Sequence, residues 1–413
     1  MHCPSFRWSA IGLLTVCLAP AAIARAQTPD PQVSVQATSA KPTFEIYGFA
    51  MLDIGHDFKQ IDPDWFDTMR VTKLPSFEKQ FGENNSTFAG VRQSRLGVRS
   101  STPTALGDLK TTFEFELFGT GVDSGQTTFR LRHAYGELGA FGAGQYWSPF
   151  MDPDVFPNSL EYWGPTGMVF FRNVQVRYMP IMGENTFLTF ALERPGAGNE
   201  LEQLETPALT GVQGRFPAPD VSGEFRYGGK WGYVEEAAIF RYIAWDHIGA
   251  DPINLAGHAF GWGFNTSSNI KLGGKNVLKL QAVYGRAIQN YMNDGGSDIG
   301  VQANPADPAR PVIGKPLPIL GLVAFVDLYW NARLSSSVGY SHVRIWNTDA
   351  QPGTSLETGQ YALGNLLVHP TPDVLMGAEV QWGRRVGFDG FTSNDVKVQF
   401  SFKYSFSQKI GGT

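Results

Sequence analysis

The stretch 396–406, VKVQFSFKYSF, alternates strictly between two kinds of side chain. Every even-numbered residue is apolar or aromatic, and every odd-numbered residue is polar or charged. A period of two is that of a β-strand with one apolar and one polar face. Strands of soluble proteins usually have about 5–6 residues, whereas a tilted strand that crosses a bilayer needs about 9–11. The stretch therefore fits either a long strand of a soluble sandwich or a strand of a membrane barrel.

Similar segments recur along the chain, and the connections between them are alternately short and long. Examples are GA at 139–140 and PTPD at 370–373 against the long segments 149–170 and 289–316. Outer-membrane barrels have tight periplasmic turns and long external loops, whereas a sandwich gives no reason for this alternation. We expect sixteen strands, near 44–55, 87–100, 107–118, 127–138, 140–148, 171–180, 185–194, 220–228, 231–245, 256–268, 275–288, 317–331, 333–346, 358–370, 373–385 and 396–406.

The sequence thus predicts an all-β fold, a transmembrane antiparallel β-barrel of about 16 strands over residues 44–406. The barrel must close, because an open strand edge in hydrocarbon costs several kcal/mol for each unpaired backbone group. Roughly sixteen strands leave an aqueous channel. The even face of 396–406 would then face lipid, with Tyr404 and Phe406 in an interfacial aromatic girdle. Residues 407–413 would form a C-terminal tail.

The N-terminal region predicts export, and together with the predicted barrel this indicates the outer membrane of a bacterial cell. Arg7 precedes the apolar run 10–18, and Ala24-Arg25-Ala26 offers a cleavage point, so residues 1–26 are expected to be a signal peptide. Residues 27–43 would be a short periplasmic tether. Removal of 1–26 takes away two arginines and changes the formal charge from −5 to −7, with 31 basic and 38 acidic residues left. This acidic balance argues against a nucleic-acid partner.

Several kinds of chemistry have no sequence signal. Cys3 and Cys17 both lie in the predicted signal peptide, and the seven histidines show no metal-ligand spacing. The motifs GxSxG, GxGxxG and HExxH and a P-loop are missing from the sequence. We therefore expect no enzyme, no cofactor and no metal. Two alternatives stay open: a barrel enzyme such as a lipase with an unrecognised Ser/His pair, and a secreted β-sandwich or adhesin.

The polar face of the predicted strands carries twelve basic and nine acidic residues, an excess of basic charge inside an acidic protein. The basic residues are Arg95, Arg99, Lys110, Arg130, Arg132, Arg177, Arg226, Arg241, Lys279, Arg385, Lys397 and Lys403. The acidic residues are Glu45, Asp53, Glu114, Glu116, Glu193, Glu224, Glu235, Asp327 and Glu379, and other acids lie in loops, for example Glu200, Glu202 and Glu205. A lumen wall of this kind attracts small anions.

Two pairs of arginines, Arg95 with Arg99 and Arg130 with Arg132, should form a ladder along this wall. Guanidinium groups suit carboxylates because they offer a bidentate fork. Alternatively, each arginine pairs with lumen acids such as Glu114 and stabilises the interior.

The segment 149–170 is the candidate constriction loop, because it is long, rich in proline and aromatic residues, and acidic at Asp152, Asp154 and Glu161. Folded inward, these acids would face the arginines and create a transverse field. Folded outward, they would be solvated.

Several segments resemble known porins. EIYGFAMLDIG (45–55) resembles the first strand of general bacterial porins, and the segments 94–119, 129–152 and 172–180 resemble the second to sixth strands with the start of the inward loop. LQAVYGRAIQNYMND (280–294) and the segment 317–341 are most similar to DcaP-like porins. The resemblance covers nearly all of 44–406.

The resemblance implies a passive diffusion channel for small hydrophilic solutes, with a preference for anions such as dicarboxylates. It implies a homotrimer in outer-membrane lipid, and it places Arg95, Arg99, Arg130, Arg132 and Arg177 on the basic wall of the pore. DcaP-like porins often carry an N-terminal coiled coil, but residues 27–43 contain no heptads. Trimerisation would then depend on the barrel wall alone.

Overall fold

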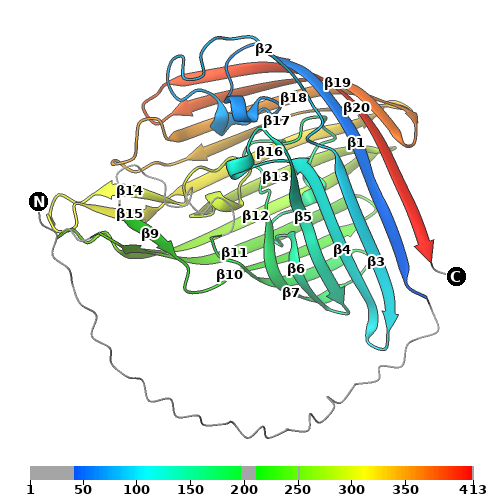
Figure 1. The fold of residues 1–413 in the computed structure, drawn as a ribbon. Helices are drawn as coiled ribbons and strands as arrows, with labels where there is room; N and C mark the ends of the chain where they lie inside the picture. Colours follow the sequence, from blue (N-terminus) through cyan, green and yellow to red (C-terminus); the bar gives the residue numbers. More distant parts are fainter. Residues whose placement is uncertain (1–40, 197–210, 250–251, 412–413) are drawn as a thin grey trace, which may run out of the picture. The chain divides into compact units, whose positions relative to one another are not determined.

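The computed structural model describes residues 41–196, 211–249 and 252–411, and Figure 1 shows their long strands as a sheet that curves back on itself. The predicted signal peptide 1–26, residues 27–40 of the predicted tether and the acids Glu200, Glu202 and Glu205 lie outside the described residues. The described strands belong to one unit, Ala37–Thr413.

Eighteen hydrogen-bonded strands make a barrel of sixteen, because two strands are interrupted. The strands β2 and β3 both pair with β1, and β9 and β10 both pair with β11, so each couple forms one barrel strand. The first half contains β1 (Thr43–Asp57), β2 (Ser86–Gly90) with β3 (Arg95–Thr104), β4 (Gly107–Phe118), β5 (Thr127–Leu138), β6 (Phe141–Trp147), β7 (Arg172–Met182), β8 (Thr186–Glu193) and β9 (Val212–Arg215) with β10 (Asp220–Gly229). The second half contains β11 (Gly232–His247), β12 (Gly257–Gly273), β13 (Asn276–Arg286), β16 (Pro318–Tyr329), β17 (Leu334–Ile345), β18 (Leu356–Thr371), β19 (Val374–Gly387) and β20 (Thr392–Gly411).

The barrel closes where β1 pairs with β20, from Thr43 opposite Gly411 to Asp57 opposite Lys397. All sixteen predicted strands are present, which confirms the predicted barrel and excludes the sandwich. The predicted C-terminal tail is wrong, because β20 continues through 407–411 and bonds to the first residues of β1. The sequence did not predict β9 or the separate hairpin of β14 (Ile299–Ala303) and β15 (Val312–Pro316).

The side chains of β20 alternate as the sequence predicts. Phe400 and Tyr404 expose 53% and 56% of their surface on the outer face, whereas Lys397 and Gln399, of the opposite parity, are fully buried. Gln399 is buried because the loop 149–170 covers it: its Nε2 donates to the carbonyl of Leu160 at 3.2 Å. The lumen is therefore partly filled.

Short turns lie at one end of the barrel and long connections at the other, as predicted. Gly139, between β5 and β6, and Gly274, between β12 and β13, have φ values of 57° and 58°, which glycine adopts readily. The long connections are 58–85, 119–126, 148–171, 194–211, 248–256, 287–317 and 346–355, whereas the last connection at this end, 388–391, is a short turn because β20 begins earlier than predicted. The long connections contain the 3-10 helices η1 (Pro63–Trp65), η2 (Val71–Lys73), η3 (Gly121–Asp123), η4 (Pro153–Val155) and η5 (Gln289–Tyr291). Within the described residues, no helix has the length and apolarity that a membrane span requires.

Three of the long connections pack against the inner wall. Met69 of 58–85, Met168 of 148–171 and Tyr291 of 287–317 are completely buried in one hydrophobic cluster. The cluster also contains Val283 of β13 and Tyr361 of β18, which face inward. The connections therefore narrow the lumen with a packed apolar layer rather than extending into solvent.

Candidate functional site

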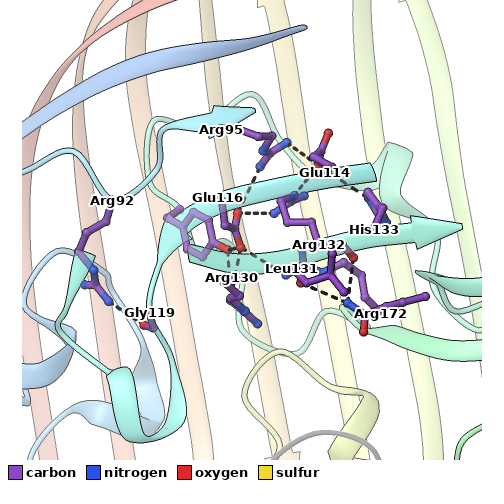
Figure 2. A network of polar contacts seen from close by, with 12 residues as sticks. Arg92, Arg95, Glu114, Glu116, Gly119, Arg130, Leu131, Arg132, His133 and Arg172 are labelled. Carbon is purple, nitrogen blue, oxygen red and sulfur yellow. Dashed lines mark hydrogen bonds and ion pairs between the residues drawn. The ribbon is translucent and has the colours of Figure 1, made fainter. Parts of the chain in front are cut away.

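Two glutamates of β4 lie between arginines of the neighbouring strands. The register pairs Glu116 with Arg95 of β3 and with Arg130 of β5. Arg132 of β5 donates from Nε to Glu114 and from Nη1 to Glu116, each at 2.6 Å. Figure 2 shows these side chains pointing toward one another from adjacent strands. Charge-assisted bonds of this length are strong, so cross-strand geometry fixes the position of Arg132.

Three more guanidinium groups approach Glu116 at longer distances. Nitrogens of Arg130 and Arg172 each lie 3.5 Å from Oε1, and Nη2 of Arg95 lies 3.7 Å from Oε2. We call Arg95, Arg130, Arg132 and Arg172, together with Glu114 and Glu116, the arginine cluster. Its four arginines and two glutamates give a formal charge of +2.

Arg172 is the one arginine of the cluster that the sequence did not predict. It is the first residue of β7, and strict alternation would place it on the outer face, together with the exposed Val174 and Val176. At the first residue of a strand the side chain is not yet held to one face, so Arg172 turns inward to Glu116. Strand parity therefore could not find it.

The acids of the cluster are buried and two of its arginines are not. The side chains of Glu114 and Glu116 are 7% and 0% exposed, whereas those of Arg95 and Arg130 are 26% and 31% exposed. The arginines do pair with lumen acids, as the alternative interpretation holds. Because solvent contacts the positive members, the surface that the cluster presents to the lumen is basic.

The other two predicted arginines lie outside the cluster. Arg99 of β3 is exposed and stacks on the ring of Tyr47, with 4.1 Å between its guanidinium carbon and the ring centroid. Arg177 of β7 is 8% exposed and donates from Nε to Gln175 at 3.1 Å. Arg99 therefore keeps a charge that solvent contacts, whereas the charge of Arg177 is held within the wall.

Two acids of the predicted constriction loop contact Arg226, which is not part of the arginine ladder. Nη2 of Arg226, on β10, lies 2.7 Å from Asp152, and its Nη1 lies 2.6 Å from Asp154. Asp152 is also bonded to Tyr233 and Ser267 and is completely buried. The expectation that these acids face the arginine ladder is wrong, because both pair with Arg226, near the start of the loop, which also pairs with Glu235.

Glu161 is buried beneath the same loop. Its Oε1 accepts a hydrogen bond from the backbone N–H of Met69 at 3.0 Å, and Oε2 accepts one from Gly164. Burial raises the pKa of Glu161 to about 7, although these N–H groups oppose the shift. Glu161 therefore links the loop 149–170 to the connection 58–85. The prediction that it faces the arginine ladder is wrong.

The loop 149–170 follows the inner wall, and its backbone N–H groups bond to acidic side chains of the wall. The backbone N–H groups of Leu160 and Glu161 bond to Glu379 of β19 at 2.7 and 3.1 Å, and that of Asn158 bonds to Asp327 of β16 at 3.2 Å. Glu379 is 1% exposed and Asp327 is 2% exposed. These wall acids thus hold the loop and are hidden from the lumen.

Connections 58–85 and 287–317 also contact the loop 149–170 and hold it in place. The guanidinium group of Arg70 lies over the adjacent rings of Trp65 and Trp163, at 4.4 and 4.1 Å from their centroids, and bonds to Asp294 at 3.1 Å. Burial raises the pKa of Asp294 even though Arg70 lowers it. Trp163 donates from Nε1 to the carbonyl of Asn293 at 3.1 Å. The three connections therefore form one packed unit.

Among the described residues, no group of three or more His, Cys, Asp and Glu side chains is arranged to hold a metal ion. The candidate site consists of the arginine cluster on the barrel wall and the packed loop 149–170.

Comparisons with known proteins agree with this geometry. The DcaP outer membrane protein family matches residues 23–229, half of the chain. The outer membrane channel DcaP of Acinetobacter baumannii is 21% identical, with a TM-score of 0.72 over 90% of this chain and 99% of that chain. An anion-selective porin from Comamonas acidovorans is 10% identical, with a TM-score of 0.56 over 89% and 100% of the two chains. The trimer form of OmpT from Vibrio cholerae is 10% identical, with a TM-score of 0.54 over 89% and 100%.

The curated proteins include no match to this chain. The structural likenesses, all below 25% identity, establish the porin fold. The closed barrel and the family match together show that the chain is a β-barrel protein of the outer membrane and belongs to the DcaP outer membrane protein family.

Proposed function

We propose that this protein is a passive outer-membrane channel for small hydrophilic solutes that prefers anions such as dicarboxylates. The observation that carries the proposal is the difference in exposure within the arginine cluster. Arg95 and Arg130 are 26% and 31% exposed, while the glutamates that they approach are 7% and 0% exposed. An anion in the lumen meets guanidinium groups and is kept away from the carboxylates.

The physical basis is electrostatic focusing. A narrow aqueous path between low-dielectric walls concentrates ions of the sign opposite to the wall. Guanidinium groups bind carboxylates with a planar fork. The names of two similar structures, an outer membrane channel and an anion-selective porin, support this proposal. The proposed passage needs no cofactor and no catalytic step.

In this proposal, the loop 149–170 sets the size limit. Glu379 holds its tip and Arg226 holds Asp152 near its start, so the loop occupies a fixed position in the lumen. Arg95, Arg99 and Arg130 line the path that is left, while Arg132 and Arg177 support the wall. We further propose that the barrels form homotrimers through the wall, as the trimer form of OmpT is similar in fold.

Reversal potentials in planar bilayers test the proposal. The triple variant Arg95→Gln, Arg99→Gln, Arg130→Gln should shift the reversal potential toward cation selectivity, because the exposed charge of the wall is lost. Arg215→Gln is the matched control, since Arg215 is an exposed residue of β9 that pairs with Asp246. Liposome swelling with matched neutral, cationic and anionic solutes gives the solute order. An unchanged reversal potential in the triple variant would refute the proposal.

A further inference from the structure

Tyr162, in the loop 149–170, connects this loop to the arginine cluster. Its hydroxyl donates to Oε1 of Glu116, and Nη1 of Arg130 donates to the same hydroxyl at 3.3 Å. Its ring stacks on Phe118 at the end of β4, with 3.8 Å between centroids and 9° between planes. Tyr162 is half-buried, and its ring and its hydroxyl contact different groups.

The ring holds the tip of the loop to one side of the wall. Just before Tyr162, the backbone of Leu160 and Glu161 is bonded to Glu379 of β19. The strands β20, β1 and β3 lie between β19 and β4 in the barrel. Residues 160–162 therefore extend over three strands of the inner wall, and the stacked ring is the attachment on the side of the arginine cluster.

The hydroxyl of Tyr162 competes with arginine N–H groups for one carboxylate oxygen, Oε1 of Glu116. Oε2 of Glu116 is bonded to Arg132 at 2.6 Å. At Oε1, the hydroxyl of Tyr162 takes the hydrogen-bonding position, while Arg130 and Arg172 stay at 3.5 Å. Charged N–H donors normally reach a carboxylate at about 2.7–2.9 Å. The hydroxyl therefore keeps Arg130 from a closer pair with Glu116.

We propose that Tyr162 is a positioning residue for ion selectivity, whose hydroxyl leaves Arg130 available to solutes and whose ring fixes the edge of the constriction. This inference rests on the proposed function. It assigns selectivity to a neutral side chain, whereas a purely structural tyrosine would affect stability alone.

The variant Tyr162→Phe separates the two tasks, because it keeps the stacked ring and removes the hydroxyl. Arg130 then closes on Glu116, and the ratio of anion to cation permeability should fall roughly two- to threefold, less than for removal of a whole charge. Swelling rates with neutral sugars should stay at the wild-type value. Tyr340→Phe makes the same change on the outer face of β17, where Tyr340 is 43% exposed, and should change neither quantity.

The variant Tyr162→Ala removes the stack as well, so single-channel conductance and the size limit for neutral sugars should both increase. Heat-modifiable migration on gels verifies that each barrel is folded. An unchanged permeability ratio in Tyr162→Phe, in a protein whose ratio falls in the triple arginine variant, overturns the role of the hydroxyl and leaves the proposed function standing. Unchanged conductance in Tyr162→Ala overturns the role of the ring. If neither the arginine variant nor Tyr162→Phe changes the ratio, both proposals are wrong.

Discussion

Neutralising Glu116, one of the two buried acids of the arginine cluster, should make the channel more selective for anions. Glu116→Gln removes one negative charge that four guanidinium groups approach, at 2.6 to 3.7 Å. The formal charge of the cluster rises from +2 to +3. An arginine substitution on the same wall should act in the opposite direction, so the sign of the effect is diagnostic.

The magnitude follows from the distances. Arg130 lies 3.5 Å from Glu116, so a solute in contact with Arg130 lies about 7 Å from the lost charge, where a unit charge contributes about 0.6 kcal/mol in water. Anions and cations are affected with opposite sign. Their difference of about 1.2 kcal/mol corresponds to a roughly eightfold rise in the ratio of anion to cation permeability.

The assay is the reversal potential across a salt gradient at low ionic strength, where the screening length approaches about 30 Å near 0.01 M. Glu184→Gln, at the exposed turn between β7 and β8, is the control and should leave the ratio unchanged. Loss of a buried partner costs roughly 3–5 kcal/mol, so folded barrels are selected by their heat-modifiable migration. A folded Glu116→Gln channel with an unchanged or lower ratio would refute the reasoning.

Three further predictions concern the packed connections. Burial raises the pKa of Glu161 from 4.5 to about 7, so the folded state binds this proton more tightly than the unfolded state. The free energy of unfolding in detergent should therefore fall by about 3 kcal/mol as the pH rises from about 4.5 to about 7. Glu161→Gln should lose this dependence, and a retained slope would contradict the assignment. Arg70→Ala removes the cation that pairs with Asp294 and the contact with Trp65 and Trp163. It should therefore lower the free energy of unfolding by roughly 3 kcal/mol and shift tryptophan fluorescence to longer wavelength. Lys409→Ala, the control on an exposed residue of β20, should do neither. Arg226→Gln removes the cation that pairs with Asp152 and Asp154, so it should reduce anion preference and increase current fluctuations. Steady currents like those of the wild type would argue against this anchor.

The barrel could be predicted from the sequence because its determinants are periodic. Side chains of a strand alternate between two media, and the alternation in 396–406 reappears as exposed Phe400 and buried Gln399. The predicted last strand ends five residues too early, because 407–411 carry no alternation and are held by pairing with β1 instead.

The site was only partly predictable, because contacts between loops and the wall have no period. The ion pairs of Arg132 with Glu114 and Glu116 could be anticipated from strand parity, yet Arg172 has the wrong parity and Tyr162 lies in an irregular loop. The register of β4 against β5 also shifts after Glu114, which alternation does not reveal. The partner of Asp152 depends on the path of the loop, which the sequence did not supply.

The reversal potential of the wild-type channel across a KCl gradient tests the central claim most directly. The account predicts that the current reverses on the side of the chloride equilibrium potential, because exposed guanidinium groups and hidden carboxylates make the lumen wall positive. A potential on the potassium side, or none at all, would contradict it.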